Sequence, residues 1–550
     1  MCRLLLLLCL LPYWSMGQLR LFDAVGGQLL ASTEGRDSLA QLQQLRAWQL
    51  DYIARGYLTA SVLLPAPDSA VVYFGQRYRW RELTADSSFS GDWQRAINFR
   101  SRDYRGKPIH PPAYAAQLKR LLGHAENNGF PFASVQLVGL NADSNSLAGS
   151  LAVSRGPLIR YGRIRLEGDA PVKDRWLERY LGLMPGAVYS QKQIDAVGRQ
   201  LRALPFLVEQ SPAQQFFFNE QSELYLFLNR RRVNSFEGML GLFPNTAGNR
   251  VTLMGDLNLQ LFSVLRQGEQ LGFQFRSLQA GTQDLRIRMS WPFLFRTPLG
   301  TEGEFQLFRR DSTFLELKAR LALPYHLGGA DWFRAFTEQS RYSLLRAQPL
   351  PGLGGVSGSI FGLEYQRFRL DRAVDPLEGY RYRVGFGAGN RVRAATAEQP
   401  EFRSAQWLAT AEAEGYWRWQ PRWVLAAEGQ LRWWESDSIY TNELARLGGF
   451  RTLKGFDEAS ILASAYLWFN VEQRFLLDQS SWIYLFYNAA ILQNAAIGQG
   501  YRDRPFGFGA GLSFRNRGGV FSVAYALGSE RGNPIQLRSA KVHLGYRYLL

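Results

Sequence analysis

The chain has 550 residues, a formal net charge of +17 and many aromatic residues (15 Trp, 25 Tyr and 36 Phe), and its length is enough for two or more domains or one very large one. Its arginines alternate with apolar residues along the chain, whereas a nucleic-acid-binding protein concentrates them on one element or tail, so we expect no nucleic-acid partner. Dispersed positive charge instead fits solvated faces and attraction to an anionic membrane surface.

The first 17 residues, MCRLLLLLCLLPYWSMG, have the pattern of a secretory signal peptide. Arg3 provides a basic start, an apolar run follows from Leu4 to Leu11, and Ser15 and Gly17 are small residues at the −3 and −1 positions of a cleavage site before Gln18. The run is too short to span a bilayer as an anchor. We therefore expect a mature chain that starts at Gln18 outside the cytoplasm.

The cysteines and histidines argue against an enzyme. Cys2 and Cys9 both lie in the predicted signal peptide, so the mature chain has no thiol for catalysis, disulfides or metal binding. The four histidines are scattered without metal-ligand spacing: His110, His124, His326 and His543. We expect no enzymatic activity, no cofactor and no metal site.

Up to about residue 231 the chain mixes helical and strand patterns and repeats itself. GYLTASVLL (56–64) and GFPFASVQL (129–137) share Gly, an aromatic residue and Ala-Ser-Val-x-Leu at an offset of 73 residues. Each copy follows a helical stretch, at 38–54 and 112–127, and precedes a second short strand. Repeats at this spacing are typical of tandem small modules.

A third module extends to residue 231 and shows the order strand, helix, helix, strand, strand. Its predicted helices are 171–183 and 190–204, and SELYLFLNR (222–230) is its closing strand. The predicted domains are a signal peptide at 1–17, α+β modules at 18–83, 84–157 and 158–231, and a β-domain at 232–550.

Residues 232–550 alternate strictly between apolar and polar side chains. In PFGFGAGLSFR (505–515) and ASAYLWFNVEQRF (463–475), one face is apolar and the other is polar or small. The segments are long, about sixteen of them follow one another, and a signal peptide precedes them. Closed strands that are apolar outside and polar inside satisfy every backbone group in lipid, so we predict a transmembrane antiparallel β-barrel of about 16 strands.

An even strand count places the N- and C-termini of the barrel domain on the same side of the membrane. With the modules in the periplasm, the long connection at 437–462, which contains LGGFRTLKGFDE (447–458), is extracellular. This string fits an ordinary Gly-rich turn. It also fits a loop that folds back into the lumen, where Lys454 would pair with an inward acid. By strand parity the nearest such acid is Glu472 on strand 12, and Asn488 on strand 13 also faces inward.

The order LGGFRTLKGF, NVEQRF, IYLFYNAA and FGFGAGLSFRNRGGVFSVAYALG resembles the BamA/TamA-type family of outer-membrane protein assembly factors. The resemblance covers nearly the whole mature chain and is most specific over 447–528. It implies that the three modules are POTRA domains in the periplasm and that the barrel has sixteen strands. It also implies localisation in the bacterial outer membrane.

The resemblance also carries a loop motif, [V/I]-R-G-[F/Y], whose arginine contacts acids on strands 12 and 13. Leu453, Lys454, Gly455 and Phe456 match this motif, with Lys in place of Arg. The match extends to two wall positions: Glu472 corresponds to the acid of strand 12, and Asn488 replaces the usual Asp of strand 13. A bidentate guanidinium between two acids thus becomes one ammonium facing an acid and an amide.

The function that the resemblance implies is capture of unfolded outer-membrane proteins by the modules and their insertion through a lateral seam between the first and last strands. The residues that we assign to this seam are Phe236, Gly238, Gly241, Val542, Leu544 and Tyr546. Gly238 and Gly241 would weaken the first strand, or they simply fit close backbone contacts. Expected partners are unfolded clients, the bilayer with its lipopolysaccharide, and a periplasmic or inner-membrane protein that binds the modules.

The alternative is a two-partner-type secretion pore that exports a polypeptide through the barrel. Such pores usually carry two POTRA modules behind an N-terminal plug helix, and residues 18–36 offer no such helix. A passive porin ranks lower, because porins need no repeated periplasmic modules.

Overall fold

The computed structural model describes residues 18–25, 27–34, 38–66, 69–245, 250–277, 282–295, 297–346, 351–395, 400–478, 480–516 and 519–549. The predicted signal peptide, residues 1–17, lies outside the described residues. Across these ranges, no helix is both long and apolar enough to cross a membrane. The chain divides into two compact units: one contains 1–160 and 188–192, and the other contains 161–187 and 193–550.

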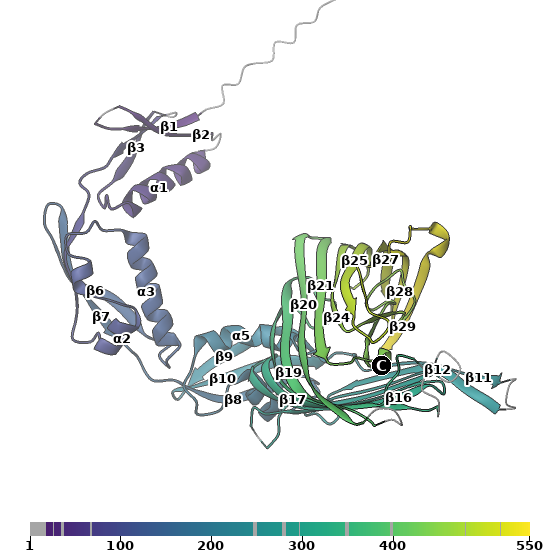
Figure 1. Ribbon diagram of the computed structural model, residues 1–550. Coiled ribbons are helices and arrows are strands. Elements are labelled where there is room, and N and C mark those ends of the chain that lie inside the picture. Colours follow the sequence, from purple (N-terminus) through teal and green to yellow (C-terminus); the bar gives the residue numbers. More distant parts are fainter. Residues whose placement is uncertain are drawn as a thin grey trace, which may run out of the picture. The chain divides into compact units, whose positions relative to one another are not determined.

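The first module is a four-stranded sheet with one helix among its described residues (Figure 1). Its elements are β1 (Gln18–Asp23), β2 (Leu29–Glu34), α1 (Ser38–Ala54), β3 (Ser61–Ala66) and β4 (Ser69–Tyr73). The sheet order is β2-β1-β4-β3, with β1 and β4 parallel. Leu21, Ala70 and Val72 are buried in the sheet, and Trp48 and Tyr52 of α1 pack against them.

The second module has the order strand, helices, strand, strand. Its elements are β5 (Arg79–Ala85), α2 (Gly91–Ala96), η1 (Ser101–Asp103), α3 (Pro111–Glu126), β6 (Ser134–Ala142) and β7 (Ser146–Ser154). The sheet order is β5-β7-β6, with β5 parallel to β7 and β6 antiparallel to it. Its core contains Leu83, Phe89, Leu121 and Leu151.

The third module is formed by β8 (Arg160–Glu167), α4 (Asp174–Leu181), α5 (Gln191–Arg202), β9 (Leu207–Phe218) and β10 (Gln221–Arg230). The central strand β10 alternates, and its inward residues Leu224, Leu226 and Leu228 are buried. Strand β9 lies at the edge of the sheet in the order β8-β10-β9.

The structure differs from the sequence prediction at two points in the modules. The boundary between 83 and 84 falls inside β5, which belongs to the sheet of the second module because it pairs with β7. In the first module, β2 stands where the third module has its first helix, and it pairs with β1. The six residues LLASTE have neither a helical stripe nor alternation, so their sequence contains no periodic signal.

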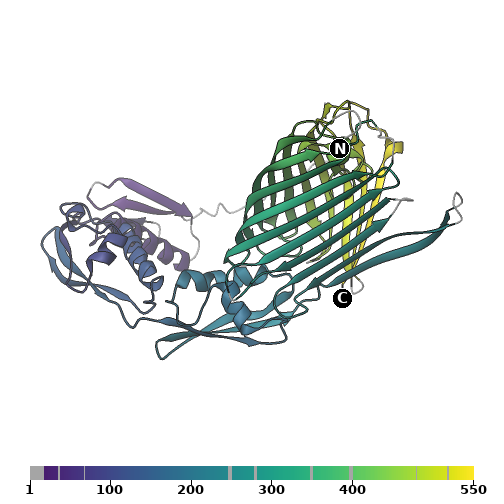
Figure 2. The ribbon, with the colours of Figure 1, turned by 60° about the horizontal axis from the view of Figure 1, so that its bottom comes forward.

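Sixteen antiparallel strands form a nearly closed barrel in the part of the chain that the structure describes (Figures 1 and 2). The first eight are β11 (Ser235–Asn245), β12 (Arg250–Phe262), β13 (Gln270–Ser277), β14 (Thr282–Trp291), β15 (Thr301–Arg310), β16 (Phe314–Gly328), β17 (Asp331–Leu344) and β18 (Val356–Leu370). The others are β19 (Gly379–Arg393), β20 (Phe402–Gln420), β21 (Trp423–Ser436), β24 (Ala465–Leu476), β25 (Trp482–Asn494), β27 (Phe506–Asn516) preceded by the short β26 (Tyr501–Asp503), β28 (Gly519–Ser529) and β29 (Lys541–Leu549). The predicted strand count and the α+β modules are confirmed.

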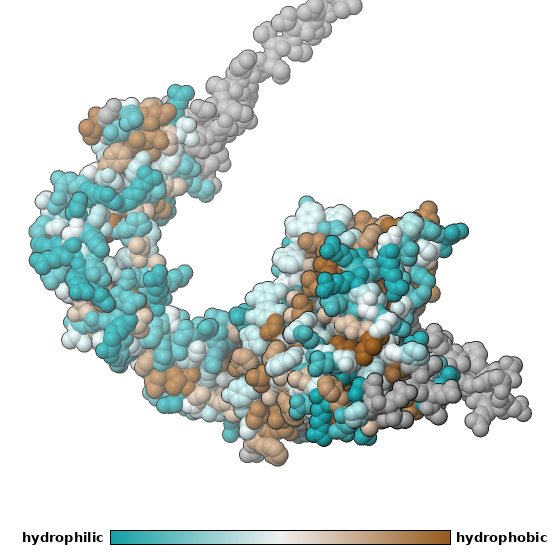
Figure 3. Space-filling model, in the orientation of Figure 1, coloured by the Kyte–Doolittle hydropathy of each residue, from teal (hydrophilic) through white to brown (hydrophobic). Residues whose placement is uncertain are grey.

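The barrel wall separates apolar from polar side chains. On β24 the outward residues Leu467 and Phe469 are exposed, whereas the inward residues Asn470 and Glu472 are buried. Figure 3 shows apolar side chains gathered on the barrel, while the second module is mostly hydrophilic. An apolar exterior with a polar interior is the arrangement that a bilayer requires.

The third module contacts the barrel at the end where the connections are short. The backbone N–H of Gly329, between β16 and β17, donates to the carbonyl of Tyr180 at 2.9 Å. Ala373, between β18 and β19, donates to the carbonyl of Arg202 at 3.0 Å. Ser263, after β12, donates its hydroxyl to the carbonyl of Pro171 at 2.5 Å. This end therefore faces the same compartment as the module, and the loop between β21 and β24 is at the opposite end.

Candidate functional site

The connection between β21 and β24, residues 437–464, folds back against the inner face of the barrel, and we call it the lumen loop. It contains η2 (Thr441–Glu443) and the paired short strands β22 (Ala445–Leu447) and β23 (Ile461–Ala463). Leu453 and Phe456 of the predicted motif are buried in a cluster with Trp468 of β24 and Leu492 of β25. Apolar packing thus holds the loop against the wall, which a turn in solvent would not require.

Lys454 points into a buried cluster of charges on β24. Its ammonium donates to Glu472 Oε1 at 3.1 Å and to Asn470 Oδ1 at 3.4 Å. The same ammonium lies 5.0 Å from the ring centroid of Phe486 on β25. Both partners of the ion pair are buried, so water screens their attraction little.

Asn488 has a different contact from the one that the sequence suggested. Its amide donates at 3.5 Å to the backbone carbonyl of Lys454, and the amide that accepts from the ammonium is that of Asn470. The physical reason is that Gly507 of β27 lets the loop backbone approach β25 and β27 at the level of Asn488. The ammonium, one side-chain length away, reaches β24.

Arg474 is a member of the cluster that sequence reasoning missed. Its guanidinium donates to Glu472 Oε2 at 2.7 and 2.9 Å, so that Glu472 accepts from two cations, one from each of its oxygens. Arg474 lies two residues after Glu472 on the same strand, so both side chains face the lumen. This alternation was the sequence signal that could have identified Arg474 as a member of the cluster.

Two glycines permit the close approach of the loop to the wall. Gly455 has φ +100°, a left-handed conformation that favours glycine, and a Cβ there would lie 2.8 Å from the backbone of Leu527 on β28. At Gly507 a Cβ would lie 2.2 Å from the carbonyl oxygen of Lys454. The glycine of the motif and a glycine of the wall are therefore complementary.

The lumen loop has two further ionic anchors that the sequence did not reveal. Arg391 of β19 donates to both carboxylate oxygens of Glu443 at 2.9 and 2.6 Å, and both side chains are almost completely buried. Arg446 donates to Glu316 of β16 at 3.0 Å. The loop is thus attached to widely separated parts of the wall.

The tip of the loop also contacts strands on both sides of the gap between β11 and β29. On one side, Asp457 pairs with Lys541 of β29 at 2.7 Å, and the backbone N–H of Gly455 donates to His543 Nε2 at 3.3 Å. On the other side, Glu458 pairs with Arg276 of β13 at 3.3 Å. Consecutive acids of one loop therefore connect the last strand to the third.

The seam itself is short. In the described residues β11 keeps eleven residue pairs with β12 and two with β29: Ser235 with Leu549 and Phe236 with Tyr548. Figure 2 shows the β11–β12 hairpin leaving the wall beside β29. Backbone pairing therefore leaves most of the β29 edge uncovered.

The predicted seam residues lie on the expected strands, and one of them takes part in the pairing across the seam. Phe236 pairs with Tyr548, whereas Gly238 and Gly241 pair with Leu257 and Met254 of β12. An added Cβ on Gly238 would lie 2.8 Å from the ring of Phe236, so this glycine makes room for that ring.

The three predicted seam residues of β29 lie in its ladder with β28. Val542, Leu544 and Tyr546 lie opposite Tyr525, Val523 and Phe521, and their side chains are exposed. They lie on the strand that forms one side of the seam, at positions before the two residues of β29 that pair with β11. Their assignment to the seam stays a prediction.

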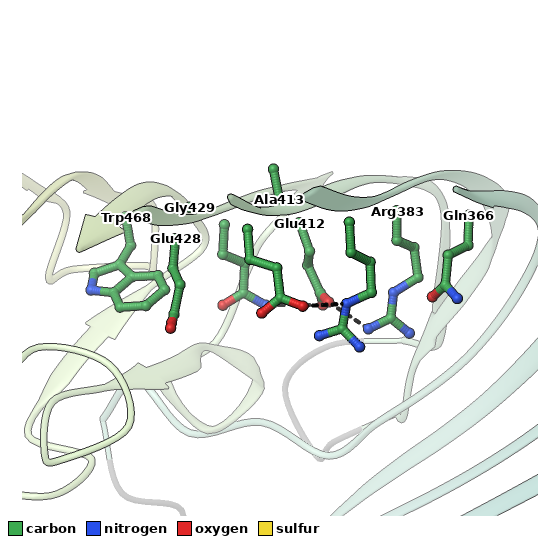
Figure 4. Close-up of a pocket in the computed structure, with 10 residues that line it drawn as sticks. Gln366, Arg383, Glu412, Ala413, Glu428, Gly429 and Trp468 are labelled. Carbon is green, nitrogen blue, oxygen red and sulfur yellow. Dashed lines mark hydrogen bonds and ion pairs between the residues drawn. The ribbon is translucent and has the colours of Figure 1, made fainter. Parts of the chain in front are cut away.

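Near the ion cluster the wall contains a polar cavity of about 210 Å³ (Figure 4). Glu428 and Trp468 line one part of it, and Arg383 and Glu412, which form an ion pair, line another. Arg381 pairs with Glu414 at 2.7 Å in the same lining. The two ion pairs neutralise four of these charges, and Glu428 adds one further acid to a polar lining.

In the described ranges no cluster of His, Cys, Asp and Glu has the geometry of a metal site. The arrangement can hold two strands together: a loop with several ionic contacts spans the gap where β11 and β29 share two residue pairs.

The fold resembles those of several solved structures. CdiB from Escherichia coli matches with a TM-score of 0.54 at 14% identity, over 93% of this chain and 97% of that one. CdiB from Acinetobacter baumannii matches with a TM-score of 0.53 at 14% identity, over 94% and 100%. BamA from Haemophilus ducreyi lacking POTRA domains 1–3 has a TM-score of 0.41 at 13% identity, over 86% and 99%. No protein-family model and no curated protein matches the sequence.

These likenesses concern the fold. They show N-terminal α+β modules followed by a sixteen-stranded barrel.

Proposed function

We propose that this chain, whose fold is that of the Omp85 superfamily, aids the insertion of other polypeptides into the outer membrane through the seam between β11 and β29. The observation that supports this most directly is the two-pair contact between these strands. In the part of the chain that the structure describes, the ladder between β29 and β11 stops after these two pairs, and a strand edge that no neighbouring strand covers is a template for an incoming strand.

The third module provides an edge that suits the capture of such a strand. β9 is the outer strand of its sheet, and Phe216, Phe217 and Phe218 are exposed at its end. Backbone hydrogen bonds would give affinity, and the aromatic side chains would prefer apolar residues of a client strand. The expected client is therefore an unfolded outer-membrane polypeptide.

The lumen loop would control the width of the seam. Asp457 connects the loop to β29, and Glu458 connects it through Arg276 to β13; Arg276 also pairs with Asp256 of β12 at 3.2 Å. If the loop stays bound to β24, the seam can open only when the loop loses its ion pair with β29 or its ion pair with β13.

The test is a disulfide across the seam in a chain that has no cysteine between residues 18 and 550. The double variant F236C/Y548C joins two paired positions of β11 and β29. In liposomes the reduced protein should accelerate folding of a urea-unfolded outer-membrane barrel, followed by its protease-resistant form. Oxidation should abolish the acceleration, and a reductant should restore it.

The control disulfide is F273C/I287C, which joins paired outward positions of β13 and β14 away from the seam. Oxidation of this variant should leave the acceleration unchanged. Equal activity of the oxidised seam variant, with the crosslink verified by mass spectrometry, would reject insertion through the seam.

A second candidate is export of a polypeptide through the lumen, favoured by the polar cavity in the wall. Against it, residues 18–34 contain β1 and β2 in their described part rather than a plug helix. An exporter keeps its conductance and its transport when the seam is crosslinked, because the chain passes through the lumen. The seam variant thus separates the two functions.

A further inference from the structure

A second recess lies outside the lumen, on the outer wall where β21, β24, β25 and β26 end near the extracellular loops. Its volume is about 680 Å³. Trp433, Leu467 and Ile491 line it, and each of these side chains is exposed on the lipid-facing side of its strand. We call this recess the rim groove.

One edge of the rim groove is basic. Arg502 and Arg504 line it, together with Asp503 between them. The carboxylate of Asp503 accepts from the backbone N–H groups of Arg504 at 2.8 Å and of Arg531 at 3.1 Å. Within the described ranges no ion pair to the guanidinium of Arg502 or Arg504 is seen, so the groove has a net positive edge.

The arginines are carried by a fixed segment. β26 pairs with the end of β25, and the hydroxyl of Tyr501 donates to the carbonyl of Leu462 at 3.1 Å. The carbonyl of Pro505 accepts from the backbone N–H of Ala490 at 2.9 Å. Arg502 and Arg504 thus lie between two anchored residues, which limits the entropy lost when they bind a ligand.

We propose that the rim groove binds a phosphate-bearing lipid of the outer leaflet. An acyl chain would lie on Trp433, Leu467 and Ile491, continuous with the apolar outer wall, and the phosphate would accept from Arg502 and Arg504. Guanidinium groups bind phosphate through charge-assisted, often bidentate hydrogen bonds. The position fits, because the groove lies where strands reach the extracellular loops and where a phosphorylated headgroup meets its acyl chains.

This inference rests on the barrel crossing the outer membrane and does not depend on what the seam does. The test uses the full chain in detergent micelles, titrated with diphosphoryl lipid A and observed by native mass spectrometry. The variant R502Q/R504Q should bind at least about tenfold more weakly, since each lost charge-assisted contact is worth roughly a factor of ten. Heat-modifiable mobility, the difference in gel migration between unheated and heated samples, verifies that the variant is folded.

The matched control is R403Q/R538Q, which removes two exposed arginines at the same end of the barrel but outside the groove. It should bind lipid A as the unchanged chain does. An equal loss of lipid A affinity in both double variants would show that only net charge matters and would overturn the proposal. Unchanged lipid A binding by R502Q/R504Q would also overturn it. If R502Q/R504Q does not fold, R502Q and R504Q are compared singly in the same titration.

Two further arms distinguish a lipid from a free anion. W433A/I491A should weaken lipid A binding while leaving any binding of inorganic phosphate unchanged, because it shortens the apolar floor alone. Inorganic phosphate that binds as tightly as diphosphoryl lipid A, or that displaces it at equal concentration, would overturn the assignment to a lipid.

Discussion

The wall around β24 and the seam around β29 are closed by different forces. β24 keeps eleven residue pairs with β21 and twelve with β25, whereas β29 keeps two with β11 among the described residues. At β24 the lumen loop adds a buried ion cluster to a complete backbone ladder. At β29 the side chains of the same loop substitute for a ladder that is nearly absent.

This difference shows where a barrel can open. A backbone ladder is lost only if many hydrogen bonds break together, whereas two exposed ion pairs and one hydrogen bond can break one at a time. The loop should therefore remain with β24 while β29 separates. The following predictions test this asymmetry, from the largest expected effect to the smallest.

Replacing Glu472 by Ala should give the largest loss, because it leaves the cations of Lys454 and Arg474 buried without their shared acid. Removing one partner of a buried ion pair costs about 3–5 kcal/mol. The measurement is the urea midpoint of the folded barrel, read from heat-modified gel migration. A midpoint within error of the unchanged chain would show that the cluster does not hold the loop.

The charge swap K454E/E472K tests whether the two side chains act on each other. Each single change should destabilise the barrel more than the double change, and the coupling free energy follows from the cycle of four proteins. Because Arg474 remains beside position 472, the rescue should be partial. A double variant no better than either single one would reject the pairing.

Replacing Gly507 by Ala should displace the loop without removing a charge. The added Cβ would lie 2.2 Å from the carbonyl oxygen of Lys454, and overpacking of this kind costs about 1–3 kcal/mol. The control is G303A on β15, where the nearest atom lies 3.9 Å from the added Cβ. Protease access to the loop should rise for G507A alone, and equal access in both variants would contradict the packing.

Neutralising the loop tip with D457N/E458Q should affect the seam more than overall stability. Asp457 and Glu458 are largely exposed, and such pairs contribute less than about 1 kcal/mol each. In the F236C/Y548C background these changes should slow disulfide formation, because the two strands spend more time apart. Faster or unchanged crosslinking would show that the tip does not close the seam.

Raising the salt concentration should have the smallest effect, and it should weaken the contacts at the seam but not those at β24. Raising the ionic strength from about 0.1 to 1 M shortens the Debye length from about 10 to 3 Å, which weakens exposed pairs and spares buried ones. Crosslinking at the seam should therefore slow at high salt, while the urea midpoint changes little. A large drop in the midpoint would place the main stabilisation in exposed pairs.

The barrel was predictable because lipid and lumen impose a period of two on every strand. The strand of PFGFGAGLSFR and the inward position of Glu472 both follow from parity alone. The first module was less predictable, since β2 is short and carries no alternation, and its pairing with β1 is decided by tertiary contacts.

The specific side-chain contacts of the site could not be predicted from the alternation of inward and outward residues. Parity places Asn470 and Arg474 on the lumen side but does not say which of several inward polar groups meets the ammonium. The Arg391–Glu443 pair joins residues 52 apart in sequence, and its formation depends on the path of a loop without periodicity. Likewise, the residue pairs at the seam depend on where β11 diverges from β29.

The joint between the third module and the barrel has a mechanical consequence. The module is bonded to turns that follow β12, β16 and β18, all in the half of the barrel that begins at β11. A pull on the module therefore acts on this half through hydrogen bonds, whereas the other half meets the module through the apolar packing of Ala203 against a cluster that contains Val424 and Leu476. Force applied to the module would therefore be carried by directed hydrogen bonds to the turns after β12, β16 and β18 and by side-chain packing alone to the cluster at Ala203.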